Sequence, residues 1–147
     1  MSTTSKLRKG VNFAPTKLTN DETTPASIPL HLYNPAHRTG LPIIISFHPG
    51  GFVTPFQPFM QYECWRQAKV YNALVIAVDY RIAPAHRYPA AVDDAYAAFK
   101  WVLRNGQRYG GDTSRMMVLG LSAGGNLAAV VCQKAKKDSL IASGYKS

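Results

Sequence analysis

The sequence predicts an α/β protein in which helices flank a mainly parallel sheet. Three short apolar runs alternate with segments of helical spacing, in the order strand, helix, strand, helix, strand, helix. The first two runs, within residues 41–51 and 73–80, are apolar on both faces, which is typical of central strands in a parallel sheet. Parallel neighbours need long connections, so we expect the intervening helices to be right-handed crossovers.

The N-terminal third of the chain contains two of the predicted strands. Residues 1–26 are polar and rich in Thr, Asn and Pro, so we expect a poorly structured lead-in. Residues 28–35, IPLHLYNP, alternate apolar and polar side chains, which predicts a short strand that ends in a proline turn. Residues 41–51, LPIIISFHPGG, predict a buried strand that stops at a glycine-rich loop.

Helices and strands alternate in the rest of the chain. Residues 59–71 carry apolar side chains at roughly helical spacing, and residues 73–80, ALVIAVDY, predict a second buried strand. The clearest helix covers residues 90–108, where apolar side chains repeat at intervals of three and four. Residues 116–121, MMVLGL, predict a third buried strand, and residues 126–136 predict the last helix.

The composition fits one domain with a packed core. The chain has 147 residues, of which 46% are hydrophobic and 17% are charged. We expect a partial α/β domain over residues 27–136, followed by a tail over residues 137–147. No apolar run approaches the roughly 20 residues needed to cross a bilayer. The N-terminus lacks the apolar segment of a secretory signal, which favours the cytoplasm.

The charge and the cysteines point to no specialised partner. A formal net charge of +9 raises nucleic acid or an acidic membrane as partners. The basic residues are scattered and cluster only near the two chain ends, so we expect solvated termini and no specific nucleic acid. Cys64 and Cys132 lie in apolar helical patterns outside any Cys or His cluster, which predicts buried free thiols and no metal site.

Residues 118–129, VLGLSAGGNLAA, place one serine between glycines where a predicted strand becomes a predicted helix. Gly120, Ser122 and Gly124 match the pattern G-x-S-x-G. A nucleophilic serine needs such a sharp turn, and glycines on either side leave room for the crowded backbone. The N–H groups at the start of the following helix would stabilise negative charge there. A serine that merely begins a helix is the alternative.

A second motif favours the nucleophile. The G-x-S-x-G pattern alone arises by chance in about one of twenty chains of this length. His48, Pro49, Gly50 and Gly51 lie upstream, at the end of another predicted strand. A loop of this kind supplies backbone N–H groups to an oxyanion hole. Pro49 has no N–H to donate, whereas Gly50 and Gly51 can donate.

Three segments, FHPGGF, VDYRIAPAHRYPAAVDDAYAAFKWV and GLSAGGNLAA, resemble the hormone-sensitive-lipase-like carboxylesterases among the α/β-hydrolases. The match runs from about residue 28 to residue 132, and the segments stand in the family's order. The resemblance implies the N-terminal half of an α/β-hydrolase fold, incomplete after the nucleophile helix. It also implies a serine carboxylesterase or lipase-like hydrolase that works through an acyl-enzyme, without cofactor or metal.

The resemblance also implies roles for single residues. The matched positions are the nucleophile Ser122, the elbow glycines Gly120 and Gly124, the oxyanion-hole donors Gly50, Gly51 and Ala123, and the loop-positioning His48. In the family this histidine is not the catalytic base. Asp79 and Arg81 match the end of a strand, and Asp93 and Asp94 match the start of a helix. These four residues are expected to be structural.

This sequence departs from the family pattern at three positions. Pro49 replaces the first glycine of the loop, a position that donates no hydrogen bond to the oxyanion. Leu121 replaces an Asp beside the nucleophile, which removes a polar contact behind the elbow. Ala85 replaces a Glu in the proline-rich loop. The departures indicate a divergent branch and not a different fold.

The acid and the base of a catalytic triad are missing from their expected place. In α/β-hydrolases the chain order is Ser, then Asp or Glu, then His. After Ser122 this sequence has one acid, Asp138, and no histidine, because all four histidines lie upstream. We therefore expect a truncated chain that is inactive alone. The strand at residues 116–121 would have an open edge, which favours self-association.

Three functions remain open at this stage. The first is a carboxylic-ester hydrolase that acts on a small ester, with short acyl groups expected from the resemblance alone. The second is a non-catalytic relative that binds a small ligand, since the family includes a plant hormone receptor that lost its catalytic histidine. The third is a basic binding protein, for which the net charge of +9 is the argument.

Overall fold

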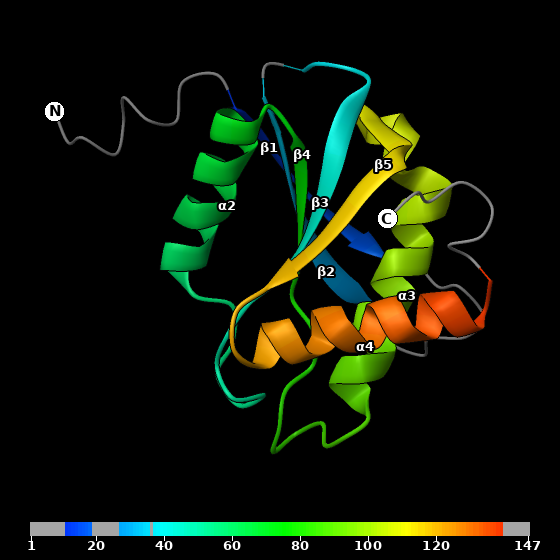
Figure 1. The fold of residues 1–147 in the computed structure, drawn as a ribbon. Helices are drawn as coiled ribbons and strands as arrows, with labels where there is room; N and C mark the ends of the chain where they lie inside the picture. Colours follow the sequence, from blue (N-terminus) through cyan, green and yellow to red (C-terminus); the bar gives the residue numbers. More distant parts are fainter. Residues whose placement is uncertain (1–10, 19–26, 36, 140–147) are drawn as a thin grey trace, which may run out of the picture.

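The computed structural model describes residues 11–18, 27–35 and 37–139. Five strands form one sheet in the order β1, β2, β4, β3, β5 (Figure 1). Strands β4, β3 and β5 are parallel, whereas β2 pairs antiparallel with β4 and β1 pairs antiparallel with β2. The strands are β1 (Val11–Leu18), β2 (Ile28–Pro35), β3 (Leu41–Phe47), β4 (Leu74–Val78) and β5 (Gly111–Gly120).

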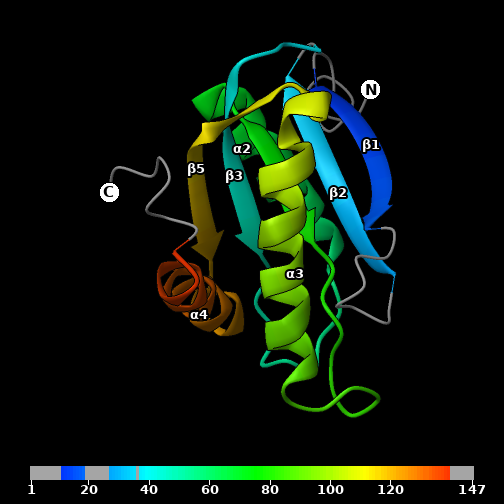
Figure 2. The same cartoon turned by 90° about the vertical axis from the view of Figure 1, so that its right-hand side faces the viewer.

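Helices cover both faces of this sheet. One face carries α2, and the other carries α3 and α4, which pack against each other (Figures 1 and 2). The helices are α2 (Pro58–Tyr71), α3 (Ala90–Asn105) and α4 (Ala123–Lys137), and the short 3₁₀ helix η1 (Gly106–Tyr109) follows α3. The predicted α/β architecture, with a parallel core and flanking helices, is confirmed.

The alternation of side chains along β4 divides the core between the two faces. Leu74, Ile76 and Val78 pack with residues of α3 and α4. Val75 and Ala77 point the other way and pack with residues of α2. All five residues of β4 are buried, which confirms that this apolar run is a central strand covered on both faces. Fully burying one such aliphatic side chain contributes about 1.5–3 kcal/mol.

The expectation of little structure before residue 27 is wrong for part of that segment. Val11–Leu18 form the edge strand β1, paired with β2 from Val11 opposite Pro35 to Leu18 opposite Ile28. A proline within the run hides the strand pattern, but an edge strand needs only half of its backbone groups for the sheet and so tolerates proline. Residues 1–10 and 19–26 lie outside the described residues.

Several element boundaries differ from the predicted ones. The last helix begins at Ala123 and not at residue 126, because the chain turns into the helix directly after Ser122. The helix predicted to reach residue 108 ends at Asn105 and tightens into η1. The domain limits at residues 27 and 136 stay a prediction, and most of the expected tail lies outside the described residues. Cys64 is buried as expected, but Cys132 is exposed on α4.

The pairing of β3 with β5 changes register near one end. Leu41 and Pro42 lie opposite Gly111 and Asp112, whereas Ile43 lies opposite Met116. From that point the register is regular up to Phe47, which lies opposite Gly120. Strand β5 is an edge of the sheet within the described residues. None of the helices described is long and apolar enough to cross a membrane.

Candidate active site

The backbone turns sharply at Ser122, between the end of β5 and the start of α4. Ser122 has φ 56° and ψ −119°, a combination that costs a non-glycine residue about 1–3 kcal/mol. The serine is exposed, and its side chain makes no capping hydrogen bond to the helix that it precedes. Helix capping therefore does not account for this serine, and its hydroxyl stands free of the helix backbone.

The glycines around Ser122 are required by close packing of backbone on backbone. A Cβ on Gly120 would lie 2.0 Å from the carbonyl oxygen of Gly124. A Cβ on Gly124 would lie 2.0 Å from the carbonyl oxygen of Phe47 and 2.8 Å from that of His48. Real Cβ atoms do not approach backbone this closely, so no larger residue fits at either position.

The loop after β3 begins beside the serine turn. Phe47 and Gly120 are opposite each other in neighbouring parallel strands, so both connections leave the same edge of the sheet. Gly124 then lies against the carbonyl groups of Phe47 and His48. The two sequence motifs are about seventy residues apart in the chain, and the sheet places their backbones in contact.

The glycine-rich loop keeps amide groups available. The carbonyl of Gly50 accepts hydrogen bonds from the amides of Val53 at 3.1 Å and Thr54 at 3.0 Å, which closes a tight turn. Gly50 has φ 133°, and a Cβ there would lie 2.6 Å from the Cβ of Thr54. Among the described residues, no acceptor takes a hydrogen bond from the amides of Gly50, Gly51 or Ala123. Free amides of this kind can bind a developing oxyanion.

His48 is buried at the base of this loop. Its Nδ1 lies 2.8 Å from the carbonyl oxygen of Pro49, and because a carbonyl only accepts, Nδ1 carries the proton. The imidazole stacks on the ring of Tyr80, with centroids 4.2 Å apart. Burial lowers the pKa of His48, although the contact with Pro49 and the charge of Asp79 oppose this shift. The Nδ1 contact and the stacking on Tyr80 hold the ring at the base of the loop, and its loop-positioning role stays a prediction.

Tyr80 fixes the loop from below, a contact that the sequence interpretation missed. Its hydroxyl donates a 2.6 Å hydrogen bond to the carbonyl oxygen of His48, the same oxygen that lies against Gly124. The segment VDYR contains Asp79, Tyr80 and Arg81. The sequence pattern indicated a structural role for the two charged residues and none for Tyr80. A buried tyrosine needs a partner for its hydroxyl, and that rule could have indicated Tyr80.

Arg81 and Asp94 join the connection after β4 to the start of α3. The Arg81 guanidinium donates to the Asp94 carboxylate at 2.7 to 3.0 Å, and the Arg81 amide adds a bond of 2.8 Å. Asp94 is fully buried, whereas the side chain of Arg81 is 24% exposed. The expected structural role of both residues agrees with this pairing.

Comparison with known proteins identifies the family. A model of a family described as alpha/beta hydrolase fold matches residues 44–144. The chain belongs to this α/β-hydrolase family. The esterase LipI of Mycobacterium tuberculosis is 45% identical over 95 residues, which are 65% of this chain and 30% of that protein. The gibberellin receptor GID1 of Oryza sativa is 41% identical over 103 residues, 67% of this chain and 29% of the receptor.

Solved structures agree with these relatives. A Pyrobaculum calidifontis esterase superposes with a TM-score of 0.81 at 36% identity, covering 92% of this chain and 44% of the esterase. This α/β hydrolase spans about a third of the length of the curated relatives that it matches. The predicted resemblance to carboxylesterases is confirmed, and the matched part is the strand and helix unit described above.

Asp138 lies far from the serine of this α/β hydrolase. It directly follows the last residue of α4, whereas Ser122 directly precedes the first, and 15 residues of helix span about 22 Å. Its carboxylate accepts a hydrogen bond from the hydroxyl of Tyr96 on α3. Burial and this contact raise the pKa of Tyr96 to about 12. Asp138 thus fastens the end of α4 to α3 and cannot orient a base at Ser122.

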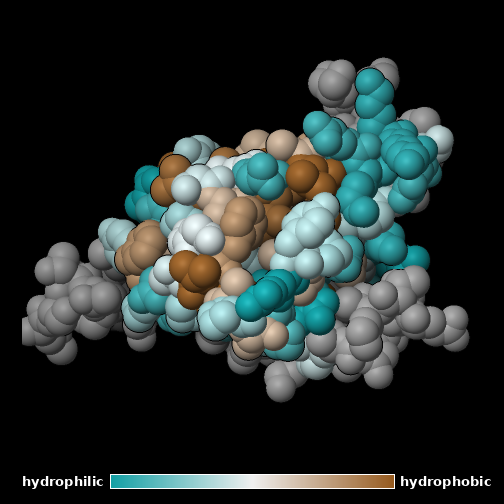
Figure 3. Space-filling model, turned by 90° about the horizontal axis from the view of Figure 1, so that it is seen from below, coloured by the Kyte–Doolittle hydropathy of each residue, from teal (hydrophilic) through white to brown (hydrophobic). Residues whose placement is uncertain are grey.

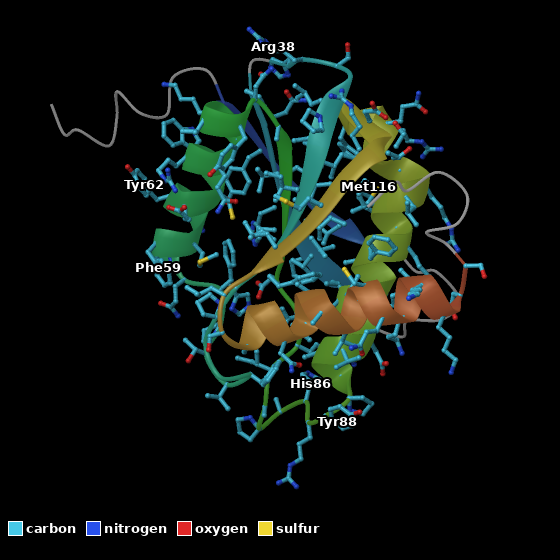
Figure 4. All side chains as sticks on the ribbon, viewed as in Figure 1. Arg38, Phe59, Tyr62, His86, Tyr88 and Met116 are labelled. Atoms are coloured by element: carbon cyan, nitrogen blue, oxygen red, sulfur yellow. The ribbon has the colours of Figure 1, made fainter. Side chains whose placement is uncertain are left out.

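The four histidines of the chain occupy different places. His31 and His48 lie toward the core, and burial lowers the pKa of both. His37 is exposed just before β3, at the opposite end of the strand from His48. His86 is exposed in the loop after β4 and lies at the lower end of the molecule, close to α4 (Figure 4).

A small pocket of 170 Å³ adjoins the serine turn. Its lining includes Phe52, which follows Gly51, and Asn126, whose amide donates to the carbonyl of Ser122 at 3.1 Å. The other lining residues come from the loop after β4 and the start of α3, and they include His86 and Tyr88. Figure 3 shows this end of the molecule, where apolar surface occupies the middle and hydrophilic side chains gather on the right. Leu121, beside the serine, is 65% exposed.

Proposed function

We propose that this chain carries the nucleophile and the oxyanion hole of a carboxylic-ester hydrolase. The observation that carries the proposal is the strained, uncapped Ser122 beside amides that have no acceptor among the described residues. Backbone strain of this kind persists where the surrounding structure enforces it, and it clusters at functional sites. The esterase names of the relatives LipI and NlhH support the reaction class.

In the proposed reaction, the Ser122 hydroxyl attacks the carbonyl carbon of a small ester. The carbonyl oxygen becomes negative and accepts hydrogen bonds from the amides of Gly50, Gly51 and Ala123. The start of α4 adds a partial positive charge at the same point. Expulsion of the alcohol leaves an acyl group on Ser122, and water later releases the carboxylic acid. Losing one oxyanion donor typically costs a factor of about 10² to 10³ in turnover.

The proton of the Ser122 hydroxyl needs an acceptor, and the chain has no histidine or acid in the usual position for this role. The sequence has no histidine after Ser122, and its one acid there, Asp138, lies at the far end of α4. In a serine protease, loss of the base lowers turnover by about 10⁶. We therefore propose that this chain by itself acylates slowly and turns over little. His86 is an exposed histidine that lines the same pocket as Asn126, next to the serine turn.

A second candidate is a non-catalytic, ligand-binding relative. One observation favours it, namely the similarity to a gibberellin receptor. In that case the amides of the loop would hold a carbonyl or carboxylate oxygen without any covalent step. The hydrolase is proposed to act on short acyl esters. Such an ester and the ligand of the alternative would both present this oxygen to the loop amides.

Acylation by nitrophenyl acetate tests the first proposal. Because deacylation lacks its base, the purified chain is expected to accumulate an acetyl group on Ser122, detected by mass spectrometry of its peptides. The adduct should disappear in Ser122→Ala and persist in Ser139→Ala, an exposed serine beyond the end of α4. An unmodified Ser122 would overturn the nucleophile assignment.

The same samples decide between the two candidates. Release of nitrophenol by the wild type beyond one equivalent, and faster than by Ser122→Ala, would contradict slow turnover. His86→Ala would then show whether that histidine supplies the base. Saturable binding of an intact ester without any adduct would support the ligand-binding candidate in place of the hydrolase. Specific binding of nucleic acid by the basic chain is a third alternative. No feature of the described residues supports it.

A further inference from the structure

A second pocket lies at the end of the sheet opposite to the serine turn. It has a volume of 290 Å³, close to the lower limit of about 300 Å³ for small-molecule sites. Strand β3 begins beside it and ends at the motif loop, a span of about 20 Å for seven residues. Figure 4 shows the separation, with Arg38 at the upper end and His86 at the lower end. The pocket is therefore distinct from the candidate active site.

The residues that line this pocket are of two kinds, cationic and apolar. Arg38, Arg108 and His37 line it, and the lining includes no carboxylate from the described residues. Leu32 and Leu74 form an apolar base, because both are buried in the core of the sheet. Thr39, Asn34, Tyr109 and Gly110 complete the lining.

The two guanidinium groups keep their charge unneutralised. Arg38 donates to the amide oxygen of Asn72 at 3.2 Å, which orients the side chain without cancelling its charge. No carboxylate in the described part of the chain pairs with Arg38 or Arg108. The nearby Asp112 is already bound to Arg115 at 2.8 Å. An anion entering the pocket would meet two guanidinium groups without competition from a fixed acid.

Asn34 joins the loop that carries Arg38 to the end of η1, which carries Arg108. Its side chain accepts a hydrogen bond from the Arg38 amide at 3.0 Å and donates to the Arg38 carbonyl at 3.0 Å. It also donates to the carbonyl of Tyr109 at 2.8 Å. Gly110 allows this approach, because a Cβ there would lie 2.2 Å from the Arg38 carbonyl oxygen. The rim of the pocket is thus preorganised, which lowers the cost of binding.

We propose that this pocket binds a phosphate monoester with a small apolar group. Arginine forks bind phosphate oxygens in pairs, and a doubly charged phosphate suits two guanidinium groups and an imidazole better than a neutral ligand does. The apolar group would lie on Leu32, Leu74 and the ring of Tyr109. The assignment goes beyond the proposed ester hydrolysis and does not depend on it.

Calorimetric titration of the full chain with phenyl phosphate tests the assignment. We expect saturable binding with a Kd of about 1 mM, weaker binding of inorganic phosphate, and none of phenol. Arg108→Gln and Arg38→Gln should each weaken binding at least about tenfold, since each removes a charge-assisted contact. Both arginines are exposed, so unchanged thermal midpoints of the variants are expected to show that folding is intact.

Two controls make the result decisive. Arg87→Gln removes the same charge from an exposed loop at the other end of the sheet and should leave the Kd unchanged. Ser122→Ala should also bind normally, which separates this site from the candidate active site. The proposal is overturned by the absence of saturable binding, by an equal loss in Arg87→Gln, or by tighter binding of benzoate than of phenyl phosphate.

Discussion

Single glycine residues determine how closely the two motif loops approach. Gly124 lies against the carbonyls of Phe47 and His48, and Gly120 lies against Gly124. The next residue, Gly125, is less confined, because the nearest atom to its added Cβ would be the Gly120 carbonyl oxygen at 3.2 Å. Two adjacent glycines in one helix turn therefore differ sharply in what they tolerate.

Gly124→Ala is expected to lower the free energy of unfolding by at least about 3 kcal/mol, since the methyl group meets rigid backbone. Gly125→Ala should change it by less than about 1 kcal/mol, because the helix propensity of alanine offsets a modest contact. Urea unfolding of both variants checks this difference. Equal destabilisation would show that the turn does not depend on the contact between Gly124 and strand β3.

At the scale of elements, the connection after β4 depends on one ion pair. The Arg81 side chain and amide both bind the buried carboxylate of Asp94, which lies in the first turns of α3. The same connection carries Tyr80, whose hydroxyl donates to the His48 carbonyl at the base of the glycine-rich loop. The ion pair thus places a helix and a motif loop relative to each other.

Arg81→Ala should lower the free energy of unfolding by about 3 kcal/mol, because it leaves the Asp94 carboxylate buried without its partner. Arg115→Ala breaks a comparable contact to Asp112 in which both groups are far more exposed, and should have a much smaller effect. Thermal unfolding of the two variants gives the comparison. A similar loss in both would mean that burial of Asp94 does not set the cost.

The strands and helices with strong patterns could be predicted from the sequence, and those with weak patterns could not. The buried runs became β3 and β4, and the periodic segment at residues 90–108 became α3 and η1. Strand β1 was missed because its proline-containing run has no clear strand pattern and is stabilised by pairing with β2. The contact of Tyr80 with His48 joins residues 32 positions apart, which no local pattern reveals.

At the scale of the whole molecule, the buried His48 and the half-buried His31 link stability to pH. Burial lowers the pKa of His31 and His48 below the ordinary value of 6.5. As pH falls through 6.5, the unfolded chain binds protons at these positions that the folded chain still excludes. The free energy of unfolding should therefore fall below pH 6.5 and be fully retained above it.

His48→Gln should flatten this fall, because an amide can still donate to the Pro49 carbonyl but does not titrate. His37→Gln changes an exposed histidine and serves as the control. Urea unfolding between pH 5 and pH 8 measures both slopes. If His48→Gln kept the slope of the wild type, the pH dependence would have to arise elsewhere.

The exposed edge of β5 is the reason for predicting self-association. Met117 is 47% exposed and Leu119 is 37% exposed on this edge strand. A charge on an edge strand opposes pairing with another chain. Met117→Lys is therefore expected to shift sedimentation toward monomer at high protein concentration, whereas Val70→Lys, at an exposed position of α2, should not. Monomeric wild type at all concentrations would contradict the prediction.

The register change between β3 and β5 gives the sheet one adjustable end and one invariant end. The extra residues of β5 lie between Asp112 and Met116, and regular pairing resumes from Ile43 onward. A residue gained or lost in that stretch would be absorbed before Met116, so the step from Phe47 to Gly120 would keep its alignment. Insertions can therefore accumulate at the end of the sheet near Arg38 while the serine and the glycine loop remain neighbours.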